Sequence, residues 1–250
     1  MSDNCLIVIP IYKDYLFDYE ELSLKQCVKI FKDKYKIVFI QPNIDTINVE
    51  KILKQYNIDL EYEYHYDILY FHERFFYSRD SYNTLLLISN IYDLLRSVIN
   101  NVKYMLLYEL DGFVFYDNLE YWINKNYDFI GSFSFAYLDF YNTTNKNVFH
   151  MCGGVSLRNI DYCIDTIKYI KQDKGWMIDS NCWEDMLLTF YSPKINAPQP
   201  AETFDFCWSH RYFTSYILNN FRLPVFLHYY QLNHYFYNIC KQKYNIIFFP

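Results

Sequence analysis

Apolar and polar positions at the start of the chain predict a parallel β-sheet. Cys5–Tyr12 is an apolar run marked by Pro10, which is typical of a strand that is buried on both faces. Helical spacing follows in Glu20–Phe31, and Lys36–Ile40 is a second apolar run. Strand, helix and strand in this order form a βαβ unit, whose ligands bind beyond the carboxyl ends of the strands.

The same alternation continues through the middle of the chain. Ser81–Val98 has helical spacing, with Asp80 or Ser81 as its N-cap. The stretch 58–70 alternates only in part and stays ambiguous. Further expected elements are a buried strand, a short helix capped by Asp117 and another strand, at Tyr104–Tyr108, Asn118–Asn124 and Tyr127–Gly131.

The second half of the chain mixes short elements with loops. Residues 134–150 are polar and irregular, which predicts a mobile loop. Next we expect a short strand and two helices, at Gly153–Leu157, Ile160–Ile170 and Trp183–Phe190. Prolines from Pro198 onward predict loops and short elements that pack over the sheet. Because no linker or internal repeat interrupts the pattern, we expect one α/β domain over residues 1–250.

The composition of the chain argues against several classes of protein function. The formal net charge of -6 argues against nucleic acid as the main partner, because phosphate contacts need a basic face. Seven scattered cysteines without a C-x-x-C pair are typical of reduced thiols in a cytoplasmic protein. The longest apolar runs fall far short of the roughly 20 residues of a membrane span, so we expect no transmembrane segment. The 29 Tyr and 22 Phe still leave room for a peripheral membrane contact.

The most informative pattern is the pair of carboxylates that follows the strand Tyr104–Tyr108. Glu109 and Asp111 are two residues apart, so on an extended backbone both side chains point to the same side. Mg²⁺ and Mn²⁺ prefer carboxylate oxygens, and such a cation neutralises a nucleotide diphosphate so that it can leave. The alternative is a pair of solvated acids in an ordinary turn at Asp111–Gly112.

Two further patterns carry weaker signals. Glu184 and Asp185 begin a helix, where a carboxylate could accept the proton of a sugar hydroxyl. Acids are also common at helix N-termini, because the helix dipole stabilises them. His228 follows an apolar run marked by Pro224 and could complete a metal site, but a buried, hydrogen-bonded histidine is the alternative. The chain lacks the Gly-rich motifs of dinucleotide-binding and P-loop folds.

Eight short motifs, in order along nearly the whole chain, resemble those of a large bacterial and eukaryotic family of glycosyltransferase-like proteins, long catalogued as a domain of unknown function. Members typically show VIPIYK, S-L-x-Q-C, YNxLML, Q-L-D-A-F-V-F, Y-D-Y-I-G-A, N-G-G-F-S-L-R, an E-D pair and P-F-G-C-H-A-W. The corresponding segments are Ile9–Lys13, Ser23–Cys27, Tyr82–Leu87, Glu109–Phe115, Tyr127–Ser132, Cys152–Arg158, Glu184–Asp185 and Leu223–His228.

The resemblance implies a GT-A-like nucleotide-diphospho-sugar transferase fold, with a mixed, mostly parallel central sheet flanked by helices. It implies a glycosyltransferase that moves a sugar from a nucleotide-diphosphate-sugar donor to a glycan, lipid-linked or protein acceptor, as in polysaccharide biosynthesis. The cofactor would be Mn²⁺ or Mg²⁺, held by Asp111 with Glu109 and His228. The donor-binding residues would be Pro10, Tyr12, Lys13, Asn83, Glu109, Asp111, Gly153 and Gly154. Glu184 and Asp185 would be the catalytic pair, with Asp185 as the general base if the enzyme inverts the anomeric configuration.

The chain departs from the family pattern at several positions. Glu109 stands where relatives often have Gln, Cys207 stands where Glu is common, and Val225–Leu227 replaces F-G-C before His228. These departures affect acceptor recognition more than donor binding. They keep open a non-catalytic nucleotide- or sugar-binding relative as an alternative. A nucleotidyltransferase acting on sugar phosphates is the other alternative, because it also places acids and a metal at a strand end.

Overall fold

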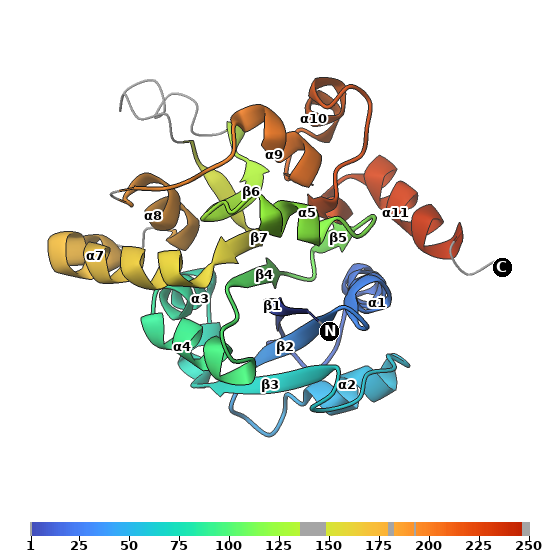
Figure 1. Ribbon diagram of the computed structural model, residues 1–250. Helices are drawn as coiled ribbons and strands as arrows, with labels where there is room; N and C mark the ends of the chain where they lie inside the picture. Colours follow the sequence, from blue (N-terminus) through green and yellow to red (C-terminus); the bar gives the residue numbers. More distant parts are fainter. Residues whose placement is uncertain (1, 136–148, 180–182, 193, 247–250) are drawn as a thin grey trace.

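A six-stranded, mostly parallel β-sheet forms the centre of the computed structural model, which describes residues 2–135, 149–179, 183–192 and 194–246 (Figure 1). The strand order is β3-β2-β1-β4-β7-β6, in which β3, β2, β1 and β4 are parallel and β7 is antiparallel to both its neighbours. The strands are β1 (Ser2–Pro10), β2 (Tyr35–Pro42), β3 (Tyr66–Phe71), β4 (Tyr104–Tyr108), β6 (Phe129–Phe133) and β7 (Met151–Asn159). The chain reverses its direction of progress across the sheet at β1, and ligands of open α/β sheets bind at such switch points.

A smaller sheet and a set of helices complete the fold. The smaller sheet has the order β5-β9-β8, with β5 (Gly112–Val114), β8 (Cys207–Trp208) and β9 (Phe226–His228). The α-helices are α1 (Asp18–Phe31), α2 (Val49–Gln55), α3 (Arg79–Leu86), α4 (Ser89–Val98), α5 (Leu119–Asn124), α7 (Ile160–Asp179), α8 (Glu184–Phe190), α9 (Pro200–Phe206), α10 (Tyr212–Leu218) and α11 (His234–Ile246). Two 3-10 turns are η1 (Glu73–Phe76) and η3 (Tyr230–Leu232).

Both faces of the central sheet are buried, because side chains alternate along each strand. In β1, Leu6 and Val8 belong to the core that α3, α4 and α7 cover, whereas Ile7 belongs to the core that α1 and α2 cover. In β4, Met105 and Leu107 lie on the same face as Leu6. Figure 1 shows these two groups of helices on opposite sides of the sheet. Burial on both faces explains the uninterrupted apolar runs of the predicted strands.

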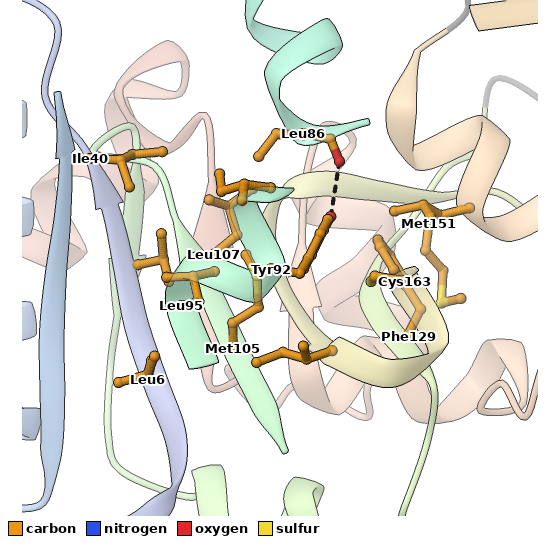
Figure 2. Packing of buried hydrophobic residues seen from close by; sticks show 14 of the residues in the cluster. Leu6, Ile40, Leu86, Tyr92, Leu95, Met105, Leu107, Phe129, Met151 and Cys163 are labelled. Carbon is orange, nitrogen blue, oxygen red and sulfur yellow. Dashed lines mark hydrogen bonds between the residues drawn. The ribbon is translucent and has the colours of Figure 1, made fainter. Parts of the chain in front are cut away.

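The single helix predicted over Ser81–Val98 is wrong, because the chain breaks there into α3 and α4. Leu85, Leu86 and Leu87 are all buried, and three consecutive side chains cannot share one face of a straight helix. The break after Leu86 lets all three enter the core. The Tyr92 hydroxyl donates a hydrogen bond to the Leu86 carbonyl (3.0 Å), which compensates for the interrupted helix (Figure 2).

The start of this region also differs from the prediction. The N-cap of α3 is Ser78 rather than Asp80 or Ser81. The Ser78 hydroxyl accepts a hydrogen bond from the Ser81 N–H (3.1 Å), and the Ser81 hydroxyl accepts one from the Ser78 N–H (3.0 Å). This reciprocal pair is a capping box, and it fixes the first turn of α3.

Most other predicted elements are confirmed within a few residues, but the C-terminal part is more regular than expected. α11 is a helix of 13 residues where the prolines predicted loops and short elements. Within the ambiguous stretch 58–70, the strand begins only at Tyr66. The predicted loop 134–150 lies largely outside the described residues. Among the described helices, none has the length and apolar character to cross a membrane.

Candidate active site

Glu109 and Asp111 lie where β4 leaves the central sheet. Every residue of β4 is buried, and the chain then turns, with the Gly112 N–H donating to the Glu109 carbonyl (2.8 Å). The Glu109 N–H donates to the Gly154 carbonyl (2.9 Å), which ties the turn to β7. A Cβ on Gly112 would lie only 2.5 Å from Val155 Cγ2, so the tight approach of the two segments requires glycine.

β9 brings His228 beside these acids from a distant part of the chain. β9 pairs antiparallel with β5, so that His228 lies opposite Gly112. Its Nε2 lies 3.3 Å from Asp111 Oδ1 and 3.7 Å from Glu109 Oε2. Glu109, Asp111 and His228 each offer one ligand atom, and these atoms all lie within 4.8 Å of one another. We call these three residues the acid–histidine cluster.

The acid–histidine cluster has the donor atoms and the space that a divalent cation needs. Asp111 Oδ1 and His228 Nε2 are buried, and beyond the acid–histidine cluster itself they have no hydrogen-bond partner in the described part of the chain. Gly154 forms the adjoining wall, and a Cβ there would lie 2.2 Å from His228 Nε2 and 2.5 Å from Glu109 Oε2. Mn²⁺ accepts carboxylate and imidazole ligands together, while Mg²⁺ favours the carboxylates. The residues therefore fit either cation.

The pKa of His228 depends on the charges of the two acids in the acid–histidine cluster. Burial alone would lower the pKa of His228, but the charges of Asp111 and Glu109 raise it to about 10. In the absence of a cation, the imidazole is therefore protonated at neutral pH and neutralises part of the acidic charge. A metal-bound imidazole has to be neutral, so a cation would take the place of that proton.

A second set of buried charges holds the turn at Gly153 on β7. Arg158 is fully buried, and its guanidinium donates to Glu184 Oε1 (2.7 Å) and to the Gly153 carbonyl (3.1 Å). Asp185 Oδ2 accepts a hydrogen bond from the Gly153 N–H (2.9 Å). Since Glu184 and Asp185 begin α8, the N-terminus of this helix fixes the strand next to the acid–histidine cluster. A Cβ on Gly153 would lie 2.5 Å from Glu184 Oε1, so glycine is needed here too.

Both carboxylate oxygens of Asp185 have partners. Besides the Gly153 contact, Oδ1 accepts a hydrogen bond from the Met186 N–H (2.7 Å) and lies 3.0 Å from His150 Nε2. Burial alone would raise the pKa of Asp185, but His150 and the Gly153 N–H hold it below its ordinary value. Burial and the charge of Asp185 raise the pKa of Glu184, against the opposing charge of Arg158. The two neighbouring carboxyls thus differ in proton affinity, and Asp185 is the one that stays ionised.

A pocket of about 370 Å³ extends from Glu109 and Asp111 to the carboxyl end of β1 and the start of α3. Its lining residues are Pro10, Ile11, Tyr12, Lys13, Leu16, Tyr19, Glu20, Phe76, Tyr77, Ser78, Arg79, Tyr82, Glu109, Leu110 and Asp111. Lys13 Nζ lies 2.7 Å from Glu20 Oε2 and 3.9 Å from the centre of the Phe17 ring. The Arg79 guanidinium lies over the Trp183 ring, 4.8 Å from its centre. Aromatic rings, cations and acids thus meet in one pocket, a combination that suits a nucleotide with its phosphates.

The structure brings together nearly all the residues that the sequence singled out. Glu109, Asp111 and His228 form the cluster, with Gly154 against them, and Gly153 touches Glu184 and Asp185. Pro10, Tyr12 and Lys13 line the pocket. Asn83 is buried on α3 and is not among the described residues that line the pocket, and neither are Gly153, Gly154, Glu184, Asp185 and His228.

Sequence reasoning missed three residues of the site. Arg158 ends the motif Cys152–Arg158, and this was the signal that could have drawn attention to it. Arg79 begins α3 and lines the pocket, but an arginine at a helix start has no specific pattern. His150 precedes β7 and meets Asp185 only through the fold, so no local pattern could have found it.

Comparisons with known proteins agree with this geometry. A family model described as "Protein of unknown function (DUF5672)" matches residues 65–228. The chain belongs to the DUF5672 family. The matched segment of this DUF5672 protein runs from just before β3 to His228 and so includes all three members of the acid–histidine cluster. No curated protein sequence matches the chain.

Solved glycosyltransferase structures share the fold of this DUF5672 protein. The galactosyltransferase LgtC, in complex with donor and acceptor sugar analogues, superposes with a TM-score of 0.61 at 11% identity, over 96% of this chain and 95% of LgtC. An active-site mutant of LgtC gives a TM-score of 0.56 at 11% identity over the same shares. The bifunctional glycosyltransferase WbbM without ligand gives 0.53 at 12% identity, over 96% of this chain and 49% of WbbM. The predicted GT-A-like fold with its mostly parallel sheet is confirmed.

Proposed function

We propose that this protein is a divalent-cation-dependent glycosyltransferase, which moves a sugar from a nucleotide-diphosphate-sugar donor to a glycan, lipid-linked or protein acceptor. The observation that carries the proposal is the acid–histidine cluster at the end of the pocket between β1, α3 and β4. The likeness to solved glycosyltransferases supports the class of reaction. The position of the pocket at the switch point of the sheet supports a nucleotide ligand.

Different residues of the pocket would contact different parts of the nucleotide-sugar donor. Pro10, Tyr12 and Lys13, at the carboxyl end of β1, would hold the nucleoside, and Arg79 would contact phosphate oxygens with its guanidinium. Asp111, with Glu109 and His228, would hold Mn²⁺ or Mg²⁺. When bound, such a cation neutralises the diphosphate leaving group and so lowers the barrier to its departure.

The proposed reaction is a single displacement at the anomeric carbon. The acceptor hydroxyl oxygen forms a bond to that carbon, the bond to the phosphate oxygen breaks, and the nucleoside diphosphate leaves with the electron pair. Asp185 accepts the hydroxyl proton, because it is ionised and lies beside the Gly153 backbone next to the cluster. Gly153 and Gly154 leave room for the side chains of Glu184, Glu109 and His228 that border the site. Glu184 accepts a hydrogen bond from Arg158 and so fixes the guanidinium against the Gly153 turn.

The first test is a screen of nucleoside diphosphates and nucleotide sugars with and without Mn²⁺. A ligand at about 100 times its dissociation constant should stabilise the fold by about 2.7 kcal/mol, which a thermal shift detects. Slow release of a nucleoside diphosphate from one nucleotide sugar would support the proposal. Release of pyrophosphate would indicate a nucleotidyltransferase, and cation-dependent binding without hydrolysis would indicate a non-catalytic binding protein.

A further inference from the structure

Large apolar side chains are exposed to solvent on α10, in the turn after it, on η3 and at the start of α11. We call the following six residues, each more than half exposed, the C-terminal apolar face: Phe213, Ile217, Leu218, Phe221, Leu232 and Tyr235. The rings of Phe213 and Tyr235 are 5.5 Å apart, so the two helices present one surface. Figure 1 shows α10 and α11 on the same side of the molecule, well away from β3.

The chemistry of this face differs from that of the rest of the surface. Elsewhere among the described residues, the large exposed apolar side chains are tyrosines, apart from Phe17. A tyrosine keeps its hydroxyl in water, whereas exposed Phe, Ile and Leu gain nothing from water. Several such side chains on neighbouring elements are typical of a surface that binds a partner or a membrane.

Phe221 adds a second observation. Its φ is 59°, in the left-handed region that bulky side chains rarely adopt, and its side chain is 65% exposed. Glycine or asparagine would hold this turn with less strain. A strained backbone that displays a phenyl ring to solvent indicates that the ring has a role at the surface.

The charge of the C-terminal segment is opposite to that of the rest of the chain. Residues 206–250 contain no Asp or Glu, so all 29 acids of the chain precede them, although the protein as a whole carries a net charge of -6. The basic residues Arg211, Arg222 and Lys241 are exposed: Arg211 immediately precedes α10, Arg222 follows Phe221, and Lys241 is on α11. Arg222 pairs with Asp205 (3.3 Å), but both side chains are solvated, so the pair compensates little of the positive field.

We propose that the C-terminal apolar face, together with Arg211, Arg222 and Lys241, binds the surface of an anionic lipid bilayer. Aromatic and aliphatic side chains enter the boundary between headgroups and acyl chains, while exposed arginine and lysine contact anionic headgroups. A second copy of the chain fits this face less well, because self-association would bring Arg211 and Arg222 of both copies together.

The face is also connected to the candidate active site. His210, next to the start of α10, stacks on Tyr229 with ring centres 4.9 Å apart, and Tyr229 stacks on His228 (3.7 Å). Membrane binding through α10 and α11 thus holds the acid–histidine cluster near the lipid surface. If the proposed glycosyltransferase function holds, this position favours a lipid-linked acceptor, but the membrane contact is tested without any activity.

The test is co-sedimentation of the full chain with vesicles of phosphatidylcholine alone and of phosphatidylcholine mixed with phosphatidylglycerol. The wild type should bind the anionic vesicles and lose binding as salt rises, because added salt shortens the reach of surface charges. The triple variant Ile217→Ser, Phe221→Ser, Leu232→Ser should bind roughly tenfold or more weakly, since it loses exposed apolar area. Arg211→Ser should weaken binding about fivefold.

Two further variants separate membrane binding from folding. Phe221→Asn relieves the left-handed strain, so it should unfold at the same or a higher temperature while binding anionic vesicles less. The double variant Tyr64→Ser, Tyr70→Ser removes exposed rings at the opposite edge of the sheet and should bind like the wild type. Three results would overturn the proposal: no wild-type binding to anionic vesicles, equal loss of binding in the Tyr64 and Tyr70 control, or a wild-type dimer that the triple variant converts to monomer.

Discussion

Gly154 lies so close to His228 that a Cβ at this position would be 2.2 Å from the imidazole Nε2. The neighbouring atoms belong to the His228 and Glu109 side chains and not to the backbone of the sheet. They are also the atoms proposed to hold the cation. We therefore expect Gly154→Ala to change the free energy of unfolding by no more than about 1 kcal/mol. Its affinity for Mn²⁺ with a nucleoside diphosphate should fall about 10–100-fold, as measured by titration calorimetry.

Gly131→Ala is the matched control for this glycine. A Cβ on Gly131 would lie 2.2 Å from the Cys152 carbonyl oxygen, which is backbone and cannot move aside without distorting β6 and β7. This variant should lower the unfolding temperature more than Gly154→Ala while affecting cation affinity less. Identical effects of the two substitutions on both quantities would contradict the role of Gly154 as a wall of the cation site.

Asp111→Ala tests the cluster directly. The substitution removes one of the two carboxylates, so transfer or donor hydrolysis should fall by about 10²–10³-fold, the usual loss when one stabilising contact to developing charge is removed. The unfolding temperature should stay close to that of the wild type. Asp59→Ala removes a carboxylate that is almost fully exposed and should leave the rate unchanged. A well-folded Asp111→Ala variant with wild-type turnover would rule out the cation role.

Asp185 has two possible roles that substitution can separate. If it only anchors the Gly153 and Met186 N–H groups, Asp185→Asn should lower the unfolding temperature and the donor affinity together with the rate, because the amide has one acceptor oxygen where the carboxylate has two. As the proposed general base, it should instead lose turnover by about 10²–10⁴-fold while donor affinity is unchanged. Donor affinity and turnover rate measured on one preparation of the variant show which of the two roles Asp185 has. Surviving turnover with retained anomeric configuration in the product would exclude the base.

Cation binding should depend on pH through His228. The pKa of His228 in the folded protein lies above its ordinary value of 6.5, at about 10. The stabilisation from its contact with Asp111 and Glu109 is therefore complete below pH 6.5 and is lost as pH rises through about 10. Because a cation displaces this proton, its affinity should increase with pH in that window, by up to about tenfold per unit.

Calorimetric titration of Mn²⁺ in two buffers of different ionisation enthalpy measures the number of protons released on binding. Release of about one proton per bound cation is the expected result near neutral pH. His228→Asn, which carries no such proton, should bind the cation more weakly and with little dependence on pH. Cation binding by the wild type without proton release would show that His228 is not a ligand.

The buried pair of Arg158 and Glu184 should dominate the stability of the β7–α8 junction. Arg158→Leu leaves the Glu184 carboxyl buried without its partner, which should lower the free energy of unfolding by about 3–5 kcal/mol. The double variant Arg158→Leu, Glu184→Leu removes both charges and should recover part of that loss in chemical denaturation. A double variant no more stable than Arg158→Leu would contradict this account.

Much of the sheet and the acidic centre of the site could be predicted from local sequence. β1 and β4 are apolar on both faces, and the position of Glu109 and Asp111 at the end of such a strand needs no tertiary information. Contacts between distant segments could not be predicted. His150 meets Asp185, and His228 meets Asp111, only because β7 and β9 carry them there.

The helices show the limits of periodicity and composition. No glycine, proline or charge marks the break between α3 and α4, which follows from the burial of three consecutive leucines. α11 contains three Tyr and two Asn, which have modest helix propensity, and its helical form depends on packing of Phe236 and Cys240 into the core. Tertiary packing therefore determines both the break between α3 and α4 and the helical form of α11.

The ladder between β4 and β7 sets the spacing of the candidate active site. Leu107 lies opposite Ser156, Tyr108 opposite Val155, and the next backbone hydrogen bond joins Glu109 to Gly154. Deleting or inserting a single residue in either strand would shift this pairing by one and turn every later side chain to the other face. Such a protein could keep its central sheet and still present leucine where the carboxylate should be. Length variation among natural relatives should therefore avoid these two strands and concentrate in the surface segments between them.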